Sequence, residues 1–315
     1  MKIPIPNQTL LTDDPQLQEI ALKITDQITV DRIYFFQFQY KKISFPELII
    51  LIPRSAKQHL TEAKPLANVI LSRYQNYKFR MFHTHEVRDA LNQGSMVFSN
   101  ICRPENLIYR QTESPIDAVI YELNYQTVQN NTTTKFNKEL KKVADFREGT
   151  KFYWDCKNYP LSAFMLHQSL ELSYRAAEIL IVGKERASHC LRSHQKYLSH
   201  YAQEFNLVFN EKKEEDMELV DLLNDAYSAV RHKNTYQITQ NQLALLVDKA
   251  SAMDILITEL YQLISEQFTQ DFILNENPDN SESIDIKTMP HKDITIENLK
   301  ITLNKIEMMI KNVLQ

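Results

Sequence analysis

Glycine is the residue that most limits this chain: it occurs three times in 315 residues, at Gly94, Gly149 and Gly183, each time alone. Loops that cradle phosphate groups need glycines at short, fixed intervals, because only a residue without a side chain lets backbone N–H groups approach the anion. The sequence therefore excludes a P-loop, a dinucleotide-binding loop and a kinase-type loop. It contains no G-x-S-x-G elbow either.

The overall composition is that of a globular protein. Hydrophobic residues make up 43% and charged residues 24%, and no apolar run approaches the ~18 residues of a membrane span. The N-terminus lacks the basic start and the continuous apolar stretch of a signal peptide. We therefore expect a soluble, cytoplasmic protein with no membrane partner, and the length allows two domains.

Cysteine usage and charge narrow the possible ligands. Cys102, Cys156 and Cys190 are scattered and form no C-x-x-C pair, which argues against a disulfide framework or a zinc finger. The formal net charge of −4 gives no overall field that attracts nucleic acid. An RNA contact would have to come from a local basic patch.

The N-terminal third alternates helix and strand patterns. Asp14 followed by Pro15 is typical of a helix start, and residues 32–40 and 47–53 read as a strand pair. If the segment YKFRMFHTHEV is extended, His83 and His85 lie on one face of it. A last strand is predicted at 106–110.

Beyond a polar stretch, the remaining pattern is helical. Residues 161–182 carry an apolar face, with Glu171 and Arg175 spaced for an i,i+4 pair, and Thr239 with Gln242 forms a capping box before the last long helix. Four antiparallel helices predict a bundle. The predicted fold class is α+β, divided into a mixed sheet domain at 1–125, a linker at 126–148, a helical bundle at 149–270, an acidic linker at 271–293 and an amphipathic helix at 294–315.

Three segments of the bundle carry a family resemblance. LHQSLELSYRAAEIL, then ASHCLRSH, then LNDAYSAVRHKNTY resemble a HEPN domain, with its HQ-x-x-E first helix, its Ser-His-x-Leu start to the second and its arginine-bearing third. The resemblance covers about residues 150–268. It implies a helical bundle that commonly dimerises, and in active members a metal-independent ribonuclease with Arg followed four to six residues later by His.

Only the first half of that ribonuclease motif is present. Arg231 fits the arginine, but the histidine positions hold Tyr236, Gln237 and Ile238, none of which is a general base near neutral pH. His232 adjoins Arg231 and on a helix points about 100° away. We therefore expect no catalytic residue. The alternative is a ribonuclease whose motif departs from the family pattern and consists of Arg231, His232 and Tyr236.

The N-terminal half resembles a nucleotidyltransferase domain of the kind often joined to HEPN bundles. DRIYFFQFQYKKISFPELIILIP resembles its first hairpin, and ALNQGSMVFSNICRPENLIYR resembles its end. Active members have a Gly-Ser turn and an Asp-x-Asp pair that holds two magnesium ions. This chain has Gln37, Phe38 and Gln39 at the turn and a lone Glu47 on the strand. The resemblance thus implies a degenerate domain.

Each histidine of interest can be a ligand or a structural group. His83 and His85 alone fall short of a metal site, and His189 more plausibly hydrogen-bonds the bundle. His167, with Gln168 and Glu171, belongs to the first-helix pattern of the family and reads as a buried, satisfied histidine or as a ligand. We expect no metal and no cofactor.

Two functions remain open. The first is a non-catalytic regulatory protein that binds a nucleotide, a nucleic acid or a partner protein; the second is a toxin-type or defence-type ribonuclease. Related bundles pair through the third helix, so we expect a homodimer with Leu223, Tyr227, Val230 and Arg231 along its interface and the two Arg231 side chains near the two-fold axis. The expected ligand-binding residues are Arg231, Asn234, Tyr236, His167 and Glu171.

Overall fold

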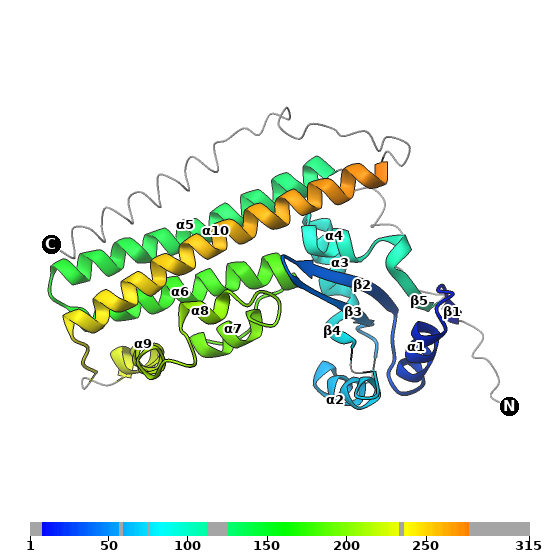
Figure 1. The fold of residues 1–315 in the computed structure, drawn as a ribbon, viewed down its shortest axis with the longest axis horizontal. Coiled ribbons are helices and arrows are strands. Elements are labelled where there is room, and N and C mark those ends of the chain that lie inside the picture. The colour runs from blue at the N-terminus through cyan, green and yellow to red at the C-terminus, as the bar shows by residue number, and fades with distance from the viewer. Residues whose placement is uncertain (1–7, 57–58, 75, 112–124, 233–235, 277–315) are drawn as a thin grey trace. The chain divides into compact units, whose positions relative to one another are not determined.

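The computed structural model describes residues 8–56, 59–74, 76–111, 125–232 and 236–276, and the side chains of 8–9, 230–232 and 271–276 lie outside the description. The chain divides into two compact units, Met1–Thr132 and Thr133–Gln315, here called the N-terminal and C-terminal units. The first is a mixed sheet with helices and the second is helical (Figure 1). The predicted α+β class is confirmed.

The N-terminal unit is built on a five-stranded sheet in the order β1-β5-β2-β3-β4. Its strands are β1 (Gln8–Leu10), β2 (Arg32–Tyr40), β3 (Ile43–Ile52), β4 (Lys78–His83) and β5 (Leu107–Gln111). β2 and β3 form an antiparallel hairpin, and β3 pairs with β4 in parallel. A parallel pair needs a crossover, which α2 (Leu60–Leu71) provides.

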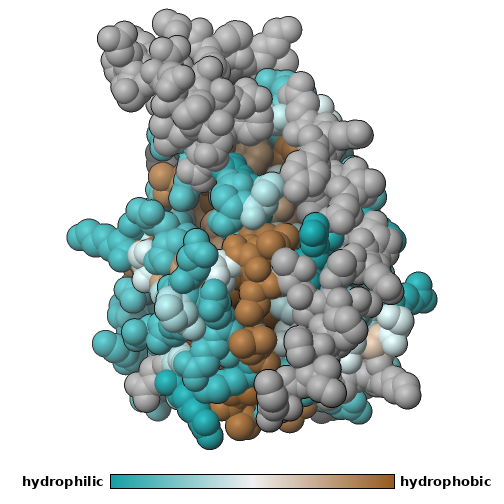
Figure 2. All heavy atoms as spheres, turned by 90° about the vertical axis from the view of Figure 1, so that its right-hand side faces the viewer, coloured by the Kyte–Doolittle hydropathy of each residue, from teal (hydrophilic) through white to brown (hydrophobic). Residues whose placement is uncertain are grey.

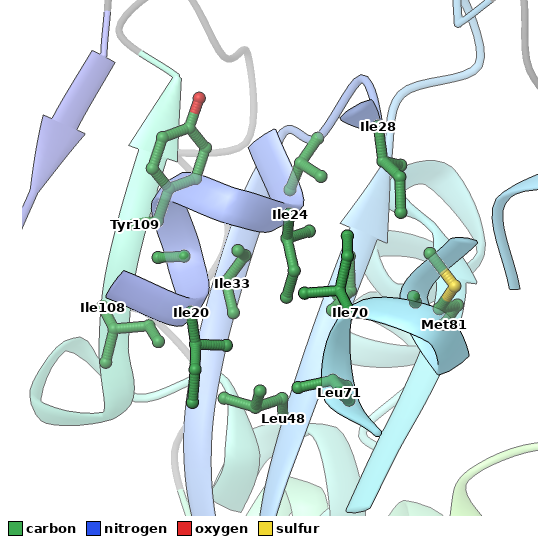
Figure 3. Close-up of a cluster of buried hydrophobic side chains, with 14 of the residues drawn as sticks. Ile20, Ile24, Ile28, Ile33, Leu48, Ile70, Leu71, Met81, Ile108 and Tyr109 are labelled. Carbon is green, nitrogen blue, oxygen red and sulfur yellow. The ribbon is translucent and has the colours of Figure 1, made fainter. Parts of the chain in front are cut away.

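Helices cover both faces of this sheet, so the central strand is buried on both sides. Isoleucine and leucine side chains of α1 (Pro15–Gln27) and α2 pack with residues of β2, β3 and β5 in one core (Figure 3). On the other face, the rings of Phe82 of β4 and Phe98 of α4 (Met96–Ile101) meet edge to face, with their planes 90° apart. This explains the continuous apolar run of β3, which a one-sided sheet would not require.

Local signals in the sequence place several of these elements. Asp14 caps α1 by accepting hydrogen bonds from the backbone N–H groups of Gln16 and Leu17, as the Asp-Pro pair predicts. The predicted strands at 32–40, 47–53 and 106–110 correspond to β2, β3 and β5. The extended reading of YKFRMFHTHEV is wrong in its second half, because β4 ends at His83 and α3 (Thr84–Asn92) begins directly after it.

The C-terminal unit is organised around α6 (Tyr159–Val182), which packs on α7 (Leu191–Leu198), α9 (Glu214–His232) and α10 (Gln240–Glu276). The short α8 (Phe205–Val208) packs on α7 and α10. α5 (Tyr125–Asp155) lies along α10, where Arg147 donates to the Ala250 carbonyl and to Asp254. Figure 1 shows the long helices running side by side.

The helical boundaries correct two expectations. Residues 126–148, predicted as a linker, lie inside α5, because Val128, Phe136 and Val143 are buried along one side of that helix. Residues 271–276, predicted as the start of a linker, belong to α10, which continues to Glu276. Residues 277–315, including the amphipathic helix predicted at 294–315, lie outside the described part of the chain.

Apolar surface remains on the N-terminal unit. Seen from the side on which α1 and β1 lie, hydrophobic side chains gather in a narrow strip between hydrophilic ones (Figure 2). In this unit Leu11, Leu22 and Val69 are 46%, 50% and 69% exposed. Along the described helices, no segment is long and apolar enough to cross a membrane.

A buried ion pair joins β3 to β4. Glu47 is fully buried, and Arg80 grips its carboxylate with two hydrogen bonds, Nε to Oε1 at 2.8 Å and Nη2 to Oε2 at 2.5 Å. A charge removed from water in this way is costly unless it is paired and hydrogen-bonded. Each member of the pair therefore depends on the other.

Replacing Arg80 with methionine should lower the free energy of unfolding by about 3–5 kcal/mol, because the Glu47 carboxylate stays buried without the guanidinium. The double variant Glu47→Leu/Arg80→Met removes both charges and should be clearly more stable than Arg80→Met. Urea unfolding followed by circular dichroism measures both. A double variant as unstable as the single one would contradict the pairing argument.

Candidate functional site

Polar side chains gather on the face of α6 that meets α9 and the loop at residues 183–190. His167, Glu171 and Glu178 of α6 are all buried, at spacings of four and seven residues, so they follow one side of the helix. Buried carboxylates and imidazoles need hydrogen-bond partners. The loop and the start of α7 supply them with two further histidines, His189 and His194.

His167 is a neutral, fully bonded histidine. Its Nε2 lies 3.0 Å from the His189 carbonyl, which can only accept, so Nε2 carries the proton. Its Nδ1 then accepts from Nε2 of Gln168 at 3.1 Å. Burial lowers the pKa of His167 to about 4, and the neighbouring His189 and His194 add to this. His167 thus acts as a structural link between α6 and the loop.

His194 is equally fixed. It and Glu178 are fully buried, with Nδ1 2.8 Å from Oε1 of the carboxylate. The second ring nitrogen lies 2.9 Å from the Ser188 carbonyl, and Oε2 of Glu178 accepts from the backbone N–H of Arg186 at 2.7 Å. These bonds determine the path of the loop between α6 and α7.

His189 differs from both because one side of its ring faces solvent. Its Nδ1 lies 3.1 Å from each oxygen of Glu171, and its side chain is 55% exposed. The imidazole stacks on Tyr227 of α9 with ring centroids 4.4 Å apart and planes 19° apart. Among the described residues, no hydrogen bond uses Nε2 of His189. The result is an imidazole held in orientation by a carboxylate, with an open nitrogen.

Glu171 also has a guanidinium beside it. Arg175, one turn later, approaches Oε1 at 3.6 Å, as the i,i+4 spacing predicts. Nδ1 of His167 lies 3.9 Å from Oε2, but it accepts from Gln168 and donates nothing to the carboxylate. The carboxylate is 5% exposed. Of the predicted site residues, His167 and Glu171 are therefore brought together, and His189 completes the cluster.

The predicted site residues at the end of α9 fall differently. Arg231 and His232 belong to α9, but their side chains lie outside the described residues, as does all of Asn234. The Tyr236 hydroxyl donates to the Leu222 carbonyl at 3.0 Å, and burial raises the pKa of this phenol. Tyr236 thus joins the segment before α10 to the backbone of α9.

Leu223, expected along a dimer interface, is fully buried inside the bundle. It belongs to the core that α9 forms with α6, so it is not available to a second protomer. Tyr227, one turn later, is partly buried and contacts the rings of His167 and His189. This part of the interface expectation is corrected by the packing of α9.

The second predicted histidine pair lies in the N-terminal unit. The rings of His83 and His85 stack with centroids 5.5 Å apart, although they belong to a strand end and a helix rather than to one strand face. Their Nδ1 atoms are buried without a hydrogen-bond partner. Within the described ranges, no group of three or more His, Cys, Asp or Glu side chains is placed to hold a metal ion.

Comparison with known families identifies the helical part. Residues 140–254 match the model of the HEPN domain family, so the chain contains a HEPN domain that extends from within α5 into α10. The resemblance seen in the three sequence segments is thereby confirmed, and the match begins before the predicted boundary at 149. No curated protein matches the chain.

Sequence reasoning found part of this site. It grouped His167 with Glu171 and expected His189 to hydrogen-bond the bundle, which it does. It did not join Glu171 to His189, because they are 18 positions apart and the chain between them includes a loop whose path depends on Glu178 and His194. The sequence signal that could have joined them is the pair of family segments, because HQ-x-x-E contains Glu171 and Ser-His-x-Leu contains His189.

The lowered pKa of His167 predicts a pH dependence of stability. As pH falls below the ordinary value of 6.5, the unfolded chain takes up a proton that the folded His167 refuses until about pH 4. The stabilisation is complete above pH 6.5 and is lost through this window. Between pH 7 and pH 5 this single group should lower the free energy of unfolding by about 2 kcal/mol.

Urea unfolding of the wild type and of His167→Gln at both pH values measures this contribution. The variant should be less stable at pH 7 but should lose less stability on acidification. His200→Gln is the matched control, because His200 is exposed and should leave the pH dependence unchanged. Equal pH dependence in wild type and His167→Gln would contradict a neutral, buried His167.

Proposed function

We propose that this chain is a non-catalytic HEPN binding and regulatory protein whose ligand is a nucleotide or an RNA. One observation carries the proposal. Where active HEPN ribonucleases have their catalytic histidine, this chain has Tyr236, whose hydroxyl donates a hydrogen bond to the Leu222 carbonyl. Ile238, another of the possible positions, is buried. The standard Arg–His pair has no base here.

The N-terminal unit supports the same proposal as a degenerate nucleotidyltransferase-like domain. Its hairpin β2–β3, the crossover helix α2 and the parallel strand β4 follow the order expected of such a domain. In an active domain two carboxylates on this strand would bind magnesium, whereas here Glu47 is the single one. Arg80 donates two hydrogen bonds to it. A carboxylate neutralised by a buried guanidinium is not a metal ligand.

A ribonuclease is the second candidate, and the Glu171–His189 pair favours it. RNA carries its own nucleophile, so one correctly placed base is enough to begin cleavage. The 2′-oxygen would attack the adjacent phosphorus as its proton passes to Nε2 of His189. The 5′-oxygen would leave and take a proton from the imidazolium, giving a 2′,3′-cyclic phosphate and a 5′-hydroxyl.

Incubating the purified protein with total RNA and EDTA separates the two candidates. Our proposal expects intact RNA, because the motif lacks its histidine. Cleavage that is lost in His189→Asn would establish the ribonuclease built on Glu171–His189. Cleavage that remains in His189→Asn but is lost in Arg231→Ala would instead establish a ribonuclease whose altered motif is centred on Arg231.

The proposal includes a homodimer formed through the HEPN domain, as is common for the family. Light scattering at micromolar concentration should give twice the 37.1 kDa mass of one chain. Because Leu223 is buried, Leu223→Ala tests the core of the bundle and not the interface. A mass of one chain would contradict the dimer without affecting ligand binding.

A further inference from the structure

We propose that His189 contacts the phosphate group of the ligand, which makes the exposed side of the Glu171–His189–Tyr227 cluster the binding site. This rests on the function proposed above and names the residue and the ligand chemistry. The shared chemistry is a phosphate carried by a nucleoside, either as a free nucleotide or within single-stranded RNA.

The first argument is the contrast among the three histidines at this face of α6. His167 and His194 each use both ring nitrogens within the protein. His189 uses Nδ1 alone, and its side chain is 55% exposed. A histidine that serves only to join loop and helix has no need of an open, outward nitrogen, as its two neighbours show.

The second argument is orientation. Nδ1 of His189 donates to a buried carboxylate that can only accept, so the tautomer is fixed and Nε2 is the group that meets a ligand. Tyr227 supports the ring from behind at 4.4 Å. When the imidazole is charged, Nε2–H donates to a phosphate oxygen while Glu171 balances the charge, and a charge-assisted bond of this kind is strong.

The third argument is the local charge. Although the chain as a whole is acidic, the loop and helix start at residues 183–192 carry Lys184, Arg186 and Arg192 against Glu185. Arg192 pairs with Asp221, whereas the guanidinium of Arg186 lies on the Ser193 carbonyl and the Tyr197 ring. Counted with Asp221, the segment around His189 has three basic side chains against two carboxylates, a small positive balance that is compatible with an anion.

The groups facing the site are consistent with an anion. Besides Glu171, they are Arg175, which shares Glu171 with His189, and His167, which is neutral. Arg175 also approaches Glu185 at 3.5 Å, so one guanidinium lies beside both carboxylates.

Fluorescence anisotropy with a labelled single-stranded RNA that carries 2′-O-methyl riboses tests the site without cleavage. AMP and adenosine, used as competitors, distinguish a nucleotide from RNA and reveal whether the phosphate is needed. The key variant is His189→Asn, whose amide nitrogen takes the place of Nδ1 and keeps the bond to Glu171 but removes Nε2. His200→Asn is the control for an exposed imidazole elsewhere on the same unit.

We expect His189→Asn to weaken binding by about tenfold or more, as for the loss of a hydrogen bond to a charged group, and to unfold at the same temperature as the wild type. His200→Asn should stay within about twofold of the wild type, in line with a substitution outside the site. AMP should compete where adenosine does not if the ligand is a nucleotide. RNA binding that AMP fails to displace assigns the site to RNA.

Two results would overturn this inference, and each leaves a different part of the proposed function intact. Wild-type binding that His189→Asn leaves unchanged removes His189 from the site but keeps the binding function. Equal competition by AMP and adenosine removes the phosphate contact. If the wild type binds none of the probes, the proposed function fails together with the inference.

Discussion

A buried carboxylate needs hydrogen-bond donors, and for Glu178 of α6 these donors come from the loop after α6 and from the start of α7. His194 and the backbone of Arg186 supply the donors, and His194 in turn takes hold of the Ser188 carbonyl. Because an unpaired charge in this position would cost several kcal/mol, the loop has one acceptable path. That path carries His189 to a position beside Glu171, two turns earlier on the same helix.

The site thus consists of two carboxylate–histidine pairs at different depths. The inner pair, Glu178–His194, is closed on all sides and fixes the backbone, whereas the outer pair, Glu171–His189, keeps one nitrogen open. A binding residue is most effective when its orientation is set before the ligand arrives. In the proposed site, the inner pair sets the path of the loop and the Tyr227 ring supports the imidazole of His189.

The sequence predicted the elements that depend on neighbouring residues and missed those that depend on distant ones. Asp14 and the box of Thr239 with Gln242 cap their helices as expected, since each acts within four residues. The region at 126–148 reads as polar because α5 buries few of its side chains, and the contacts that order it come from α10, more than 100 residues away. Likewise Glu171 and His189 form a pair through a fold that no local spacing reveals.

The two units share a feature that bears on function. Our proposal treats Glu47 as standing where a magnesium-binding carboxylate would lie, and Tyr236 as standing where a catalytic base would lie. Glu47 is paired with the guanidinium of Arg80, and the Tyr236 hydroxyl is bonded to the Leu222 carbonyl, so both groups are engaged inside the protein. His189 differs from these groups, because Glu171 holds its Nδ1 while no hydrogen bond among the described residues uses its Nε2. This contrast is why we place the proposed recognition site at the Glu171–His189 pair of the HEPN domain.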